Sequence, residues 1–146
     1  MVSVEMDSYK ISQLKMNNKI PENGTVELEN IVGFDVIHEQ DSCIAILTVQ
    51  IRHRQHPNVF GIKLELQGLF KTNGICDADT EKEAHIRCYD EIFPYANQIM
   101  TYLAVSSGMQ GFVLKKIPIQ FASINFGTNP NNGIDGGKVI KLWSDV

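Results

Sequence analysis

The sequence lacks the features that mark several large classes of protein. Its three cysteines, Cys43, Cys76 and Cys88, form no Cys-x-x-Cys motif, and their odd number argues against a disulfide framework. The densest basic cluster spans only residues 52 to 56 and the net charge is −4, so the clustered cations that nucleic acids require are missing. The first residues show no basic segment followed by an apolar one. We therefore expect a cytoplasmic protein without nucleic-acid partner, metal or cofactor.

The longest uncharged segment runs from Ile92 to Leu114, in a chain of which 21% of the residues are charged. Polar residues such as Asn97 and Gln98 interrupt it, which argues against insertion into a membrane. On a helical wheel the polar side chains gather within about 120° and the rest of the circumference is apolar. Pro94 suits a first helical turn and Gly108 a helix end, so we expect a helix over residues 94 to 107 that is buried from two directions.

Ahead of this helix the apolar residues recur with a period of two, which indicates strands. Four segments qualify, at residues 9 to 16, 26 to 38, 43 to 53 and 59 to 70, and the first changes phase between Ile11 and Leu14, as a bulge would cause. Short turns favour antiparallel neighbours. Residues 79 to 87 fit a short separate helix, and residues 138 to 143 either dock as a last strand or fray. We predict a single α+β domain: a four-stranded antiparallel sheet followed by a long helix.

In this order of elements, several short segments resemble the protein-export chaperone SecB. The similarity covers residues 9 to 121 and is most specific at Gly68-Leu69-Phe70 and Phe93-Pro94-Tyr95-Ala96. The other similar segments are Tyr9–Leu14, Val26–Glu29, His85 with Cys88, and Pro118–Phe121.

This resemblance implies a helix packed between its own sheet and partner subunits, in a homotetramer that is a dimer of dimers. It also implies a holdase that binds unfolded or export-competent polypeptides in apolar grooves and catalyses no reaction. By position, the expected client-binding residues are Phe60 and Tyr95, to which we add their neighbours Phe93 and Phe121. The expected oligomer contacts are Ile62, Leu64, Leu66, Ile99, Met100, Tyr102 and Leu103.

The sequence departs from the SecB pattern where that family uses acidic residues to dock on its motor ATPase, SecA. Asn17, Asn18 and Lys19 follow the first strand, and Lys63 lies on the fourth. Because such docking relies on complementary charge, coupling to SecA is doubtful. Residues 122 to 146 form a divergent tail rich in Gly and Asn. These departures fit a divergent branch that includes chaperones dedicated to one client, such as an antitoxin.

Other functions remain open at this stage. A hot-dog-type thioesterase or dehydratase also wraps a sheet around one long helix, although it places that helix before most strands. A non-chaperone oligomeric adaptor would share the same pattern. Cys76, His85 and Cys88 could supply three metal ligands, but their spacing matches no common zinc site.

Overall fold

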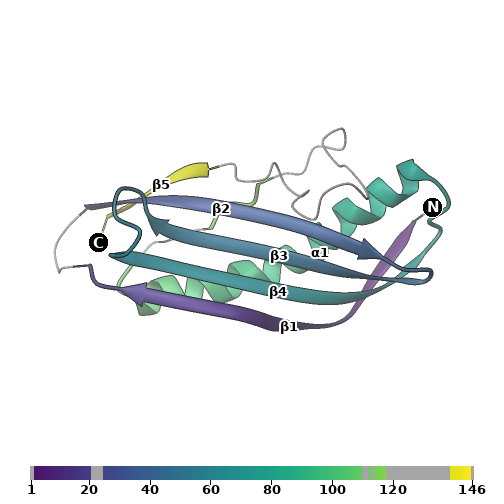
Figure 1. Ribbon diagram of the computed structural model, residues 1–146, viewed down its shortest axis with the longest axis horizontal. Helices are drawn as coiled ribbons and strands as arrows, with labels where there is room; N and C mark the ends of the chain where they lie inside the picture. Colours follow the sequence, from purple (N-terminus) through teal and green to yellow (C-terminus); the bar gives the residue numbers. More distant parts are fainter. Residues whose placement is uncertain (1, 21–24, 110–111, 113, 118–138, 146) are drawn as a thin grey trace.

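The protein is a long twisted sheet with one long helix across one of its faces (Figure 1). The computed structural model describes residues 2–20, 25–109, 112, 114–117 and 139–145. Its elements are β1 (Ser3–Asn18), β2 (Thr25–His38), β3 (Ser42–His53), β4 (Phe60–Asn73), α1 (Ala78–Ser106) and β5 (Val139–Asp145). The strand order is β1-β4-β3-β2-β5, with every neighbouring pair antiparallel. The predicted four strands followed by a long helix are confirmed, whereas the dimer of dimers stays a prediction.

The inner face of the sheet supplies most of the core. Side chains of β3 and β4 alternate strictly between buried and partly exposed, because successive residues of a strand point to opposite faces. Phe60, Leu64 and Phe70 on β4, and Leu47 and Ile51 on β3, are completely buried. The outer face carries polar residues, among them the Arg52–Glu29 ion pair at 3.0 Å, together with a few half-exposed apolar ones such as Ile37 and Leu69.

Strand β1 lies at one edge of the sheet and pairs only with β4 among the described strands. Its register shifts between Met6 and Ser8 and again between Ile11 and Gln13. Each shift inserts one extra residue, so the apolar residues before and after it stay on the face that α1 covers. The bulge predicted between Ile11 and Leu14 is therefore confirmed, and its effect is to restore an apolar inner face.

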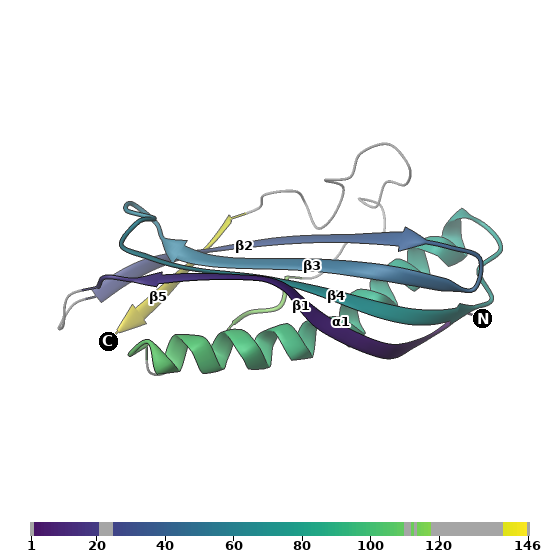
Figure 2. The same cartoon turned by 60° about the horizontal axis from the view of Figure 1, so that its bottom comes forward.

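The helix differs from the prediction, because α1 is one continuous helix with Pro94 in its interior rather than two separate helices. It begins at an Asp77 N-cap in a capping box with Thr80, whose backbone N–H donates to the Asp77 carboxylate at 2.8 Å. Proline removes one helical hydrogen bond, and the helix axis changes direction in its middle (Figure 2). Ile92 and Ala96 on either side of Pro94 are fully buried against the sheet, and this packing keeps the helix continuous. The helix ends before Gly108, as expected.

A close approach at Gly68 brings the helix onto β4. A Cβ atom at this position would lie 2.9 Å from the Phe70 ring and 3.0 Å from Ile92 Cδ1. The missing side chain of Gly68 is therefore what lets Ile92 pack directly on the strand. This is a physical reason for the glycine in the Gly-Leu-Phe segment.

The end of the chain returns to the sheet. Residues 139 to 145 form β5, antiparallel to the start of β2, so the alternative of a docked last strand is the one the structure shows. The helix follows β1 to β4, an order opposite to that of a hot-dog fold. Among the described helical residues, no stretch is long and apolar enough to cross a membrane.

Candidate functional site: an apolar strip between β1 and α1

Large apolar side chains remain half exposed along the boundary between β1 and the helix. On β1 they are Tyr9, Ile11, Leu14 and Met16, each 41–47% exposed. On α1 they are Tyr95, Tyr102 and Val105, with exposed fractions of 36%, 71% and 46%. We call these seven residues the apolar strip. It contains no charged side chain.

The β1 side of the strip is exposed because β1 is the sheet edge. Ile11 lies directly opposite Leu66, and Leu14 lies opposite Leu64, so both β1 residues share the inner face with their β4 partners. Leu64 and Leu66 are completely buried under the helix, yet their β1 neighbours are about half exposed. The helix therefore covers β4 fully and leaves the adjoining side chains of β1 partly open.

The helical side of the strip is a second apolar face of α1. Residues 95, 102 and 105 lie on one side of the helix, whereas Ala96, Met100 and Ala104 point into the core. Tyr95 contacts Tyr9 with ring centroids 4.5 Å apart and an interplanar angle of 37°. The sequence predicted that this helix is buried from two directions. Within one chain only the face toward the sheet is covered.

Two contacts tie β1 to the helix along this strip. The first is the Tyr9–Tyr95 ring contact, and the second is a 3.0 Å hydrogen bond that the Asn18 side-chain amide donates to the Ser107 carbonyl. Because Ser107 caps the C-terminal end of α1, this bond also satisfies a carbonyl at a helix end. The strip is thus a surface held in place at two points.

The structure separates the four expected client-binding residues. Phe60 is 0% exposed and Phe93 is 4% exposed, because both point inward between sheet and helix. Neither offers surface to a client in this structure, so their expected role is corrected to packing. Tyr95 lies on the strip. Phe121 lies outside the described residues.

The expected oligomer contacts divide in the same way. Four of them, Ile62, Leu64, Leu66 and Met100, are 0% exposed within a single chain and belong to its core. Their assignment to a subunit surface is therefore corrected. Tyr102 is 71% exposed, and Ile99 and Leu103 are partly buried beside it. Only these three retain surface that a second subunit could cover.

The exposed apolar residues of β1 were not predicted as site residues. Their alternation was visible, but exposure depends on β1 being an edge strand that the helix covers incompletely. A local sequence pattern does not show which strand lies at the edge of the sheet or how far the helix covers it. The alternating Tyr9–Met16 segment would be equally compatible with a central strand whose apolar face is fully buried.

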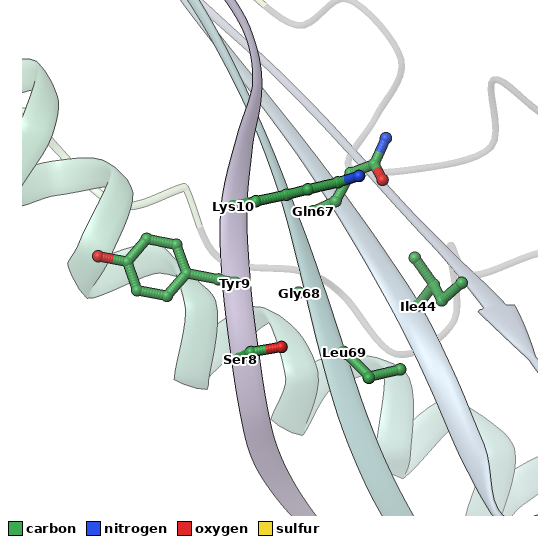
Figure 3. A pocket seen from close by; sticks show the side chains of 7 residues that line it. All are labelled: Ser8, Tyr9, Lys10, Ile44, Gln67, Gly68 and Leu69. Carbon is green, nitrogen blue, oxygen red and sulfur yellow. The ribbon is translucent and has the colours of Figure 1, made fainter.

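The outer face of the sheet has a separate, shallow hollow of about 280 Å³. Figure 3 shows Lys10 and Gln67 extending on this side, whereas Tyr9 points the other way, toward the helix. Ile44 and Leu69 form its apolar part. Its described lining includes no carboxylate, thiol or imidazole.

The other reactive side chains are divided between the core and the surface. Burial, with a smaller effect from His38, lowers the pKa of His85 to about 4, and His85 packs edge-on against Phe34. Cys76 is exposed before the helix, whereas Cys88 is buried beside Cys43. In the described part of the chain no three His, Cys, Asp or Glu side chains come together as a metal site. The set Cys76, His85 and Cys88 is therefore not a ligand cluster.

The comparisons with known proteins agree with this architecture. The family model described as preprotein translocase subunit SecB matches residues 13–127. Among solved structures, the chain is similar to a SecB-like chaperone from Mycobacterium tuberculosis in complex with a ChAD peptide from the HigA1 antitoxin. That match has a TM-score of 0.59 and 14% sequence identity, and covers 78% of this chain and 90% of the other. No curated protein sequence matches the chain.

A long antiparallel sheet backed by one long helix is the fold that this chain shares with the SecB-like chaperone. The family match covers most of the chain, so the protein belongs to the SecB family. Its function is that of a molecular chaperone, as the resemblance at the Gly-Leu-Phe and Phe-Pro-Tyr-Ala segments implied.

Proposed function

We propose that this chaperone is a cytoplasmic holdase that binds unfolded polypeptide segments at the Tyr9–Tyr95 end of the apolar strip. The supporting observation is that Tyr9, Ile11 and Tyr95 form a partly exposed apolar surface without charge. Contiguous exposed apolar surface on a folded protein usually marks an interaction site. A bound client segment would bury its own apolar side chains there and be kept from aggregating.

The side chains of the strip suit clients of varied sequence. The two tyrosines offer rigid apolar rings with a polar tip, and Ile11 adds an aliphatic side chain to the same surface. Binding of this kind depends mainly on buried apolar area, with little selection by hydrogen bonds. Low discrimination is the property that a holdase requires.

We assign the other end of the strip, with Tyr102 and Val105, to contact between subunits. Tyr102 is 71% exposed on the second apolar face of the helix, and Ile99 and Leu103 lie beside it. A second copy of the chain placed on this face would cover it from the direction that the sheet leaves open. The proposed assembly is a homotetramer in which helices of different protomers meet.

Although the strip can bind unfolded segments of varied sequence, the client that we propose in the cell is an unfolded protein dedicated to this chaperone, such as an antitoxin, rather than the full range of exported proteins. The similar mycobacterial chaperone was solved with an antitoxin peptide. In this chain, Asn17, Asn18, Lys19 and Lys63 occupy positions where the resemblance to SecB leads us to expect acids for docking on SecA. Lys15 and Lys63 lie directly opposite each other on β1 and β4. The Asn17 amide is used in a 2.7 Å hydrogen bond to the Asn58 carbonyl.

An aggregation assay tests the proposed function. A chemically denatured, slowly refolding protein is diluted into buffer with the chaperone, and light scattering is followed over time. Equimolar chaperone should suppress the scattering, and Tyr95→Ala should weaken suppression while the oligomer mass stays constant. Absence of suppression with several unrelated clients and with an unfolded antitoxin would favour the non-chaperone adaptor instead.

A further inference from the structure

A pair of buried thiols joins the sheet to the helix. Cys43 at the start of β3 and Cys88 in α1 are each 0% exposed, and their sulfur atoms lie 3.4 Å apart. The two residues are 45 positions apart in sequence. We propose that Cys43 and Cys88 are an oxidisable dithiol, which a peroxide converts into a disulfide that fixes α1 to β3.

The geometry requires little movement. A disulfide has a sulfur–sulfur bond of about 2.05 Å, so the two sulfur atoms must approach each other by about 1.4 Å. Each sulfur already has the other as a direct neighbour in the core. Cys76 lies exposed before the helix and serves as an internal reference for an accessible thiol.

The two thiols are not equivalent, which assigns the order of the reaction. The hydrogen bond with Cys88 lowers the pKa of Cys43, while the same contact and burial raise the pKa of Cys88. Cys43 also lies beside the exposed β2–β3 turn, so we assign it as the thiol that attacks the oxidant. Cys88 is the resolving thiol.

Oxidation proceeds in two steps. The Cys43 thiolate attacks one oxygen of hydrogen peroxide, the O–O bond breaks, and Cys43 sulfenic acid and hydroxide form. The Cys88 sulfur then attacks the Cys43 sulfur, and the sulfenic oxygen leaves as water with the thiol proton. Overall, two thiols lose two electrons and two protons, and one peroxide becomes two waters.

Peroxide can reach Cys43 and Cys88 from the end of the sheet where β2 turns into β3. Asp41, two residues before Cys43, is exposed in the β2–β3 turn. A small peroxide therefore needs only a local opening between this turn and the helix. We expect oxidation to be slower than at Cys76, and to stop once the disulfide holds the helix in place.

The experiment uses the full chain with Cys76→Ser, which removes the exposed thiol and any cross-link between molecules. The protein is treated with millimolar hydrogen peroxide, denatured with excess maleimide, and analysed by intact mass and peptide mapping. The expected product has lost two hydrogens, takes up no maleimide, and yields a peptide that joins Cys43 to Cys88. Its thermal unfolding midpoint should rise by about 10 °C and return to the starting value with dithiothreitol.

Removal of one thiol of the pair is the matched control. Cys88→Ala in the same background should form no internal cross-link and show no rise in the unfolding midpoint. If this variant does not fold, peptide mapping of the Cys76→Ser protein alone decides the question. Full maleimide labelling of both cysteines after peroxide, or sulfinic acid at either one without a cross-link, would overturn the proposal.

Discussion

The rings of Tyr9 and Tyr95 join the edge strand β1 to the helix α1, with centroids 4.5 Å apart. Both side chains keep more than a third of their surface exposed. The two rings therefore pack β1 against the helix and also form part of the protein surface. It links two segments that are far apart in the sequence.

Replacing Tyr9 or Tyr95 with alanine should weaken the suppression of client aggregation several-fold. The two effects should be less than additive in the double variant, because each single change already removes the shared ring contact. Suppression is measured as the chaperone concentration that halves light scattering. Lys10→Ala, on the opposite face of the same strand, is the control and should leave that concentration unchanged. If Lys10→Ala weakened the suppression as much as the tyrosine changes do, the strip would not be the client site.

The assembled protein should have a mass near four times the 16.4 kDa of one chain in light scattering. Tyr102→Lys places a charge on the helix face proposed to contact a second subunit, and should shift the mass toward dimer or monomer. Arg87→Lys, a charge-conserving change on the exposed part of the same helix, is the control. A monomeric unmodified protein would refute the assignment of this face to assembly.

Gly68→Val should destabilise the protein by about 1–3 kcal/mol, because the added carbons meet Phe70 and Ile92 in a filled core. The matched change is Gly33→Ala on β2, where nothing lies within 4 Å of an added Cβ. That variant should be as stable as the original protein or slightly more stable. The free energy of unfolding is obtained from urea denaturation of both variants. Equal stability of Gly68→Val and the original protein would mean that the helix does not pack on the strand this closely.

Stability should fall as the pH is lowered from about 6.5 to about 4, in part because of His85. Burial depresses its folded pKa to about 4, so in this window the unfolded chain binds the proton and the folded chain does not. The full effect is about 3 kcal/mol, present as stability above pH 6.5 and lost by pH 4. The free energy of unfolding is measured across this window for the original protein and for His85→Leu, which should have a shallower slope. His56→Gln, at an exposed position, should keep the original slope.

Binding to a SecA-type motor should be weak at physiological salt. The double change Lys15→Glu with Lys63→Glu should strengthen it at low salt, because it places acids on the outer face where this chain has two opposed lysines. Affinity is measured by calorimetry with purified motor protein. Lys71→Glu, also on β4, tests whether the position of the charge matters. Tight binding by the unchanged protein would show that the missing acids are not required.

Much of the fold was predictable because it rests on local patterns. The alternation of apolar residues defined β1 to β4, and the turn residues between them placed the strands as antiparallel neighbours. The bulge in β1 was visible as a change of phase between Ile11 and Leu14. The predicted helix boundary at Pro94 was wrong, because proline favours a first turn locally while burial of Ile92 and Ala96 holds the helix together across it.

The candidate site was predictable only in part. Tyr95 was identified from its place in the Phe-Pro-Tyr-Ala segment and lies on the strip. Phe60 was expected beside it but points into the core, although both are aromatic and both belong to apolar patterns. Sequence gives the chemical type of a side chain and the periodicity of its segment. It does not give the elements that come to cover that side chain.

The sequence by itself determined an antiparallel sheet followed by a helix with two apolar faces, because period and turn chemistry are properties of short segments. Tertiary structure decided that β1 is an edge and that its inner side chains stay half exposed. It also brought Cys43 and Cys88 to 3.4 Å across 45 residues. The reason is that exposure and proximity depend on which elements pack together, and packing is a property of the whole chain.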